Sequence, residues 1–149
     1  MKKFLQKKLK DQKGMTLIEL LAVIVIIAII AAIAIPAIGN IIENSRVGAM
    51  KSDALSAFAA AELYLAENAG DTAITTVELT DGGYLDDLGT FTTGPSFAFD
   101  TTTGDLILDG EAVNGGVTLT FADATKQNVI DLANSQENIA TGTIQVSGR

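Results

Sequence analysis

An unbroken apolar run from Leu20 to Ile35 constrains this chain more than any other feature of its 149 residues. About 20 apolar residues in a helix cross the hydrocarbon core of a membrane, and the run has this length once it is extended to Ile38. Six lysines and one aspartate give residues 1–14 a net charge of +5. Because lysines beside an apolar span hold that end in the cytoplasm, we expect a single-pass membrane protein with a cytoplasmic N-terminus.

A carboxylate, Glu19, stands at the head of this span. An acidic residue at the centre of a membrane helix costs roughly 2.5 to 3.5 kcal/mol, so one near the start of a span needs a partner or a purpose. The first backbone N–H groups of a helix are unpaired, which favours an anion at that end. We therefore expect Glu19 to act electrostatically, by neutralising an amine, and not in catalysis.

Residues 13–19, with the order Lys-Gly-Met-Thr-Leu-Ile-Glu, resemble the processing site of the type IV pilins and pseudopilins. Precursors in that family carry a short basic leader, Gly, a methylated first mature residue, Glu at mature position five and commonly Pro at position twenty-two. Counted from Gly14, Glu19 is the fifth residue and Pro36 is the twenty-second. The usual first residue is Phe, and Met15 is a conservative departure from it. The resemblance is specific up to about residue 40, and beyond that point only the layout agrees.

The resemblance implies a set of partners. A prepilin peptidase would cut between Gly14 and Met15 and methylate the new amino terminus on Met15. The mature subunit would then pass to an assembly ATPase and its inner-membrane platform protein, and would polymerise with copies of itself. Glu19 would neutralise the amino terminus of its own subunit or of the subunit assembled before it, and so set the register of assembly. No cofactor is implied.

Two simpler interpretations compete with this one. A secretory signal peptide would explain the basic start and Ala32-Ile33-Ala34, which imitates a small-residue cleavage site. Its apolar region has about 7 to 15 residues, however, and the run here is longer. A plain membrane anchor fits the length and leaves Glu19 without a role.

The apolar segment is rich in Ile and Ala, a composition that lets membrane helices pack closely on one another. Pro36 removes one backbone donor and Gly39 follows it, so we expect a helix kink or local unwinding near residues 32–40. After Asn40 the pattern becomes amphipathic, with apolar residues every three or four positions: Val47, Met50, Ala54, Phe58, Ala61 and Leu65. One helix from about Leu17 to Asn68 is therefore predicted.

Residues 70–149 predict a small head. The expected elements are a short helix and turn at 76–85, strands at 96–99, 105–108 and 117–121, a helix at 126–134 and a fourth strand at 143–146. The expected fold class is α+β, and the resemblance implies the type IV pilin fold, in which a long N-terminal helix packs on a small antiparallel β-sheet head. The predicted layout is a cleaved leader (1–14), a filament-core helix (15–40), its amphipathic continuation (41–69) and the head (70–149).

Composition narrows the chemistry of the head. The chain has neither His nor Cys, which excludes Ser-His-Asp and Cys-His arrangements and the usual zinc sites, so we expect no enzyme. Acidic pairs such as Asp86-Asp87 lack calcium-loop spacing, so no metal is expected. Without cysteines, the disulfide of many related pilins is missing, and the helix at 126–134 is the candidate to hold the sheet edge instead. Residues 15–149 carry a net charge of −13, which argues against direct nucleic acid binding by the head.

Three classes of function follow. The first is a major pilin, which polymerises into a type IV pilus at the cell surface for adhesion, twitching motility or DNA uptake. The second is a pseudopilin of a type II secretion or competence system, which builds a short fibre. The third is a membrane-anchored binding protein that keeps its leader. The sequence favours the first.

Overall fold

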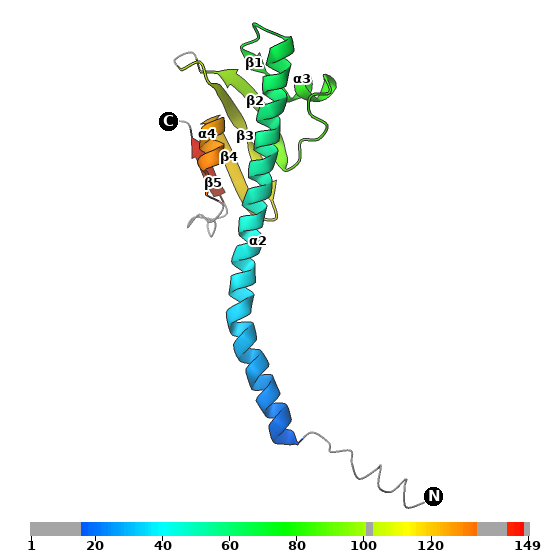
Figure 1. Ribbon diagram of the computed structural model, residues 1–149, viewed down its shortest axis with the longest axis vertical. Coiled ribbons are helices and arrows are strands. Elements are labelled where there is room, and N and C mark those ends of the chain that lie inside the picture. The colour runs from blue at the N-terminus through cyan, green and yellow to red at the C-terminus, as the bar shows by residue number, and fades with distance from the viewer. Residues whose placement is uncertain (1–15, 101–102, 134–142, 148–149) are drawn as a thin grey trace, which may run out of the picture. The chain divides into compact units, whose positions relative to one another are not determined.

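The structure, a computed structural model, describes residues 16–100, 103–133 and 143–147. The chain divides into two compact units, residues 1–40 and 41–149, which we describe one at a time. The elements follow in the order α2 (Leu17–Glu67), β1 (Ala73–Ile74), α3 (Thr76–Asp81), β2 (Phe91–Phe99), β3 (Leu106–Asn114), β4 (Val117–Thr125), α4 (Lys126–Asp131) and β5 (Thr143–Ser147) (Figure 1). Helix α2 contributes to both units and matches the predicted span of 17–68 within one residue.

In the first unit, α2 presents its apolar side chains to the surroundings. The backbone remains helical through Pro36 and Gly39, so the helix is not interrupted at the predicted breaking point. Proline is tolerated inside a long helix when the surrounding turns keep their own hydrogen bonds. Whether α2 bends at Pro36 stays a prediction.

In the second unit, the later part of α2 is amphipathic, as predicted. Val47, Met50, Ala54, Phe58 and Ala61 are completely buried. Figure 1 shows this part of the helix beside the sheet, with α3 and α4 flanking it. The apolar stripe therefore forms one wall of the core and the inner face of the sheet forms the other. This arrangement confirms the predicted α+β fold.

An edge-to-face ring contact joins the two walls of the core. The rings of Phe58 on α2 and Phe97 on β2 have centroids 5.1 Å apart and an interplanar angle of 72°. The exposed fraction of each of these residues is at most 1%. Aromatic pairs in this geometry contribute about 0.5–1.5 kcal/mol beyond the burial of their area.

The sheet has the order β1-β2-β3-β4-β5. Strands β1 to β4 form an antiparallel meander, and the turn at Gly115 and Gly116 has positive φ angles of 56° and 93°, as a tight two-residue hairpin requires. Strand β5 is parallel to β4, so the sheet is mostly antiparallel, as predicted, with one parallel pair at this edge. A parallel neighbour needs a crossover connection, and the chain between β4 and β5 contains α4.

Strand β2 begins at Phe91, five positions before the predicted start at Ser96. The sequence between them, Thr-Thr-Gly-Pro, is typical of a turn. In the structure this stretch is an irregular edge of the sheet, with register shifts between Thr93 and Ser96, and Thr76 of α3 donates its hydroxyl to the carbonyl of Pro95 (2.7 Å). Proline is accepted at such an edge because no ladder hydrogen bond needs its missing N–H.

Candidate functional site

The first turn of α2 is closed by a reciprocal pair of side chains. The backbone N–H and the hydroxyl of Thr16 both donate to Oε2 of Glu19, at 2.7 and 2.8 Å. In return, the backbone N–H of Glu19 donates to the Thr16 hydroxyl oxygen at 3.4 Å. This is a capping box, in which two orphan donors of a helix start are satisfied by the box's own side chains. The box holds the Glu19 carboxylate over the start of the helix.

The two donors that hold Glu19 are neutral, so they orient its carboxylate without cancelling the negative charge. A positive partner must therefore come from another group. The predicted cleavage and methylation residues, Gly14 and Met15, lie outside the described residues, so the distance from the amino terminus to Glu19 stays a prediction.

Beyond Glu19, apolar side chains cover α2 on all sides. Large side chains from Leu17 to Ile42 are exposed, from 88% at Leu17 to 45% at Leu20. A helix that is hydrophobic all round is stable only where something apolar surrounds it, such as lipid or neighbouring helices. Among the residues that the structure describes, α2 is the one helix long and apolar enough to cross a membrane.

The sequence carries one further signal at this helix start. Thr16-x-x-Glu19 has the readable pattern of a capping box, whereas the sequence-based expectation for Glu19 rested on its charge alone. A capping box also lies at the N-terminus of both short helices of the head, formed by Thr75 with Glu78 in α3 and by Thr125 with Asn128 in α4. Thr16 is thus the one residue near the predicted site that the structure adds.

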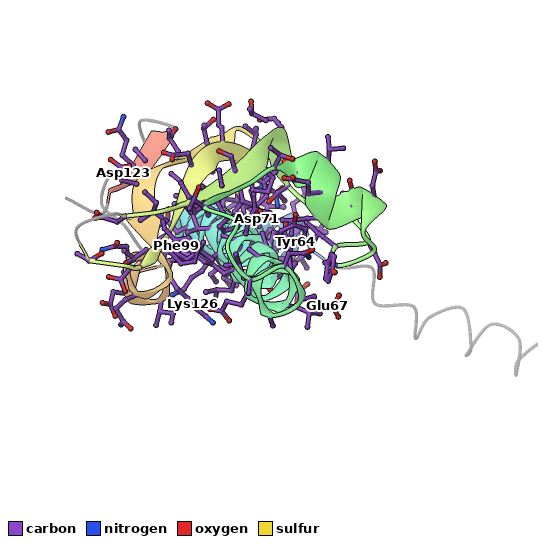
Figure 2. The ribbon with its side chains drawn as sticks, turned by 90° about the horizontal axis from the view of Figure 1, so that it is seen from above. Tyr64, Glu67, Asp71, Phe99, Asp123 and Lys126 are labelled. Carbon is purple, nitrogen blue, oxygen red and sulfur yellow. The ribbon has the colours of Figure 1, made fainter. Side chains whose placement is uncertain are left out.

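A cluster of phenols and carboxylates lies at the other end of α2. The Tyr64 hydroxyl donates to Asp71 Oδ2 at 2.9 Å, and the Tyr84 hydroxyl donates to Glu67. Their rings meet edge to face at 5.4 Å, and Figure 2 labels Tyr64, Glu67 and Asp71 around the end of the helix. The hydrogen bond to Asp71, reinforced by partial burial and by the Asp71 and Glu78 charges, raises the pKa of Tyr64 to about 12. These hydrogen bonds orient the four side chains on one another.

Within the described ranges, no group of three or more Asp, Glu, His or Cys side chains is placed to hold a metal ion. One cleft of the head, with a volume of 340 Å³, is lined by residues of α2, β3 and α4, including Phe58, Glu62 and Lys126. The Glu62 carboxylate and the Lys126 ammonium in it are joined to each other at 2.7 Å. Among the described residues, the strongest candidate site is therefore the Glu19 carboxylate in the first turn of the apolar helix.

A helix of this kind, which follows a basic N-terminal segment and precedes a small α+β unit in the chain, defines the class of chains with an N-terminal helix able to anchor in a membrane. Comparison with known families agrees with this class. Residues 9–35 match the family model described as the prokaryotic N-terminal methylation motif. This motif is the class III signal peptide of type IV pilins, so the chain carries an N-terminal signal of the kind found in type IV pilin and pseudopilin precursors.

The match covers the end of the leader and most of the apolar segment, and the head lies outside it. The comparisons with curated proteins and with solved structures gave no match. The properties of the head therefore have to be inferred from its own residues.

Proposed function

We propose that this chain is the structural subunit of a type IV pilus, a major pilin that polymerises after its leader is removed. The observation that carries the proposal is the apolar part of α2, exposed on all sides and headed by the single carboxylate of Glu19. In the membrane, lipid covers this surface. In a filament, the same surface is covered by the helices of neighbouring copies, and small Ala residues between the Ile side chains allow close approach.

The geometry of Glu19 supports the role that we propose for it. Prepilin peptidase would cut after Gly14 and expose a positively charged amine at Met15, one residue before the capping box. Glu19, held over that end by Thr16, supplies the opposite charge, either within its own subunit or toward the copy assembled before it. Removing one partner of a buried ion pair costs about 3–5 kcal/mol, because the other charge stays buried without compensation.

The remaining parts of the chain take their roles from this scheme. Residues 1–14 form the cleaved leader, 15–40 the filament core, 41–69 the amphipathic continuation and 70–149 the displayed head. The N-terminus stays in the cytoplasm until an assembly ATPase and an inner-membrane platform protein extract the subunit into a pilus at the cell surface. Adhesion, twitching motility or uptake of DNA would be a property of that fibre, and the chain itself is not an enzyme.

The test is to express the wild-type chain and two matched variants in a host that carries the assembly machinery. Glu19→Gln removes the charge at the membrane end. Glu78→Gln removes the same kind of capping glutamate from the exposed box of α3. Intact mass, N-terminal sequence and electron microscopy of sheared fibres are measured for each.

We expect all three chains to begin at N-methyl Met15. The wild type and Glu78→Gln should form long fibres, and Glu19→Gln should be processed without forming them. Long fibres from Glu19→Gln would overturn the electrostatic role. An intact Met1 start would overturn the pilin assignment, and processed chains confined to short fibres would indicate a pseudopilin of a secretion or competence system.

A further inference from the structure

The head, taken in this subsection together with the α2 residues packed on it as residues 41–149, is poor in cations, and the cations that the structure describes donate to groups of their own chain. Arg46 donates to the carbonyl of Gly115 in the β3–β4 turn at 2.6 Å. Lys51 donates to two carbonyls at the end of α4, at 2.6 and 2.9 Å. Lys126 donates to both oxygens of Glu62 at 2.7 and 2.9 Å. These three are all the Lys and Arg residues of the described ranges.

The carboxylates have the opposite arrangement. Residues 52–125 contain thirteen Asp and Glu and no Lys or Arg, and residues 41–149 carry a net charge of −12. Ten of the fifteen carboxylates in 41–100 and 103–133 are exposed. Where a carboxylate of residues 41–133 accepts a hydrogen bond, the donor is often neutral: Thr90 for the half-buried Asp53, Tyr64 for Asp71 and Gln127 for Asp131. Neutral donors orient these groups and leave their charge in place.

A second copy of the head would bring the same surface. To form an ion pair with a second copy, each of these cations would have to divide its N–H donors between that copy and the carbonyl or carboxylate that it already binds in its own chain. Arg149 is the only other cation after residue 40. Figure 2 shows Lys126 and Asp123 on different sides of the head.

We propose that the heads of neighbouring copies repel one another, and that the charged surface of the head is matched by mobile cations and not by a second head. This inference rests on the proposed function, since it concerns copies held together in a fibre. The apolar α2 segments supply the cohesion, and head charge opposes it. The fibre should therefore become more stable as ionic strength rises, which is the reverse of a fibre held by ion pairs between subunits.

The range of the repulsion fixes the conditions of the test. The screening length in water is about 30 Å at 0.01 M salt, about 10 Å at 0.1 M and about 3 Å at 1 M. At the lowest salt, charges across a whole head act on the next copy, and at the highest only charges in contact do. Screening the repulsion between a few pairs of charges on neighbouring copies should change the amount of released subunit by about tenfold.

Fibres sheared from cells are equilibrated at constant pH in NaCl at about 0.01, 0.1 and 1 M. They are then heated in steps, and released subunit is separated by ultracentrifugation and quantified. Sucrose at matched osmolality controls for osmotic effects. We expect the dissociation temperature to rise and released subunit to fall about tenfold between the lowest and the highest salt.

Two sets of variants sharpen the result. Asp86→Asn combined with Asp87→Asn removes two exposed charges and should weaken the salt dependence, whereas Asp86→Glu combined with Asp87→Glu keeps them and should behave as the wild type. Arg149→Gln tests the remaining cation and should leave the salt stabilisation in place.

Release of subunits by added salt, or no dependence on salt, would overturn the inference while leaving fibre formation, and thus the proposed function, intact. A salt stabilisation that disappears in Arg149→Gln would also overturn it. Processed protein that forms no fibre at any salt concentration would overturn both.

Discussion

The contact between Phe58 and Phe97 ties α2 to the sheet, and its removal is the sharpest test of how the head is held together. The Phe58 side chain is completely buried, and its ring lies 5.1 Å from that of Phe97. Truncating a fully buried Phe to Ala costs about 3–5 kcal/mol, because the lost transfer energy is joined by the cost of the cavity. We therefore expect Phe58→Ala to remove about 4 kcal/mol from a domain stability of about 5–15 kcal/mol.

Urea unfolding of the full chain in detergent, followed by tyrosine fluorescence, measures this loss. The chain has no Trp and two Tyr, Tyr64 and Tyr84, and both lie in the second unit, so the signal reports on the head. With a denaturant slope of about 1–3 kcal/mol per M, the midpoint should fall by about 2 M. The double variant Phe58→Ala with Phe97→Ala should reveal a coupling of about 0.5–1.5 kcal/mol.

Leu63→Ala is the matched control on the same helix, because its side chain is 53% exposed. Surface changes of this kind stay within about 0.5 kcal/mol. If Phe58→Ala shifted the midpoint no more than Leu63→Ala, the head would not depend on packing between α2 and the sheet, and the stabilising role assigned to this buried contact would be refuted.

Two further predictions use the same preparation. Lys51→Met removes two hydrogen bonds from a charged donor to the carbonyls at the end of α4, and in the urea assay it should lower the free energy of unfolding by about 2 kcal/mol. Lys126→Met breaks an exposed ion pair and should lower it by at most about 1 kcal/mol. Equal losses in the two variants would contradict this account of how α4 is held. The pKa of Tyr64 is raised to about 12, which means that the folded state favours the protonated phenol. The stabilisation that this phenol gives to the folded state is therefore complete below pH 10 and is lost as the pH rises through about 12. Tyrosinate absorbance should show this delayed titration in the folded chain, and Asp71→Asn should bring it back toward the ordinary range; an unchanged titration in that variant would assign the shift to another cause.

The elements with a strong local pattern were predictable from sequence. The apolar run and the stripe through Val47 and Phe58 repeat at helical spacing over many turns, so the bounds of α2 were found within one residue. The hairpin turn at Gly115 was equally readable, because few residues accept positive φ. The carboxylate of Glu19 could be located, since a charge beside an apolar span has few explanations.

Features set by distant parts of the chain could not be predicted. The Thr-Thr-Gly-Pro stretch of β2 has the composition of a turn and becomes a strand edge because α3 donates a hydroxyl to Pro95. The direction of β5 depends on the path of a crossover and not on the residues of the strand. The contact of Lys51 with the carbonyl of Leu132 joins residues 81 positions apart, which no local pattern encodes.

The parallel pairing of β5 with β4 also sets an order of events during synthesis. Strands β1 to β4 can form their meander from neighbouring hairpins, but β5 starts at Thr143 and reaches β4 only after the α4 crossover is in place. Because chains emerge from the N-terminus at about 5–20 residues per second, the outer edge of β4 is completed last. An unpaired edge is a template for pairing with another chain. A chain that is interrupted after α4 would thus expose that edge, whereas pairing with β5 covers it in the complete chain.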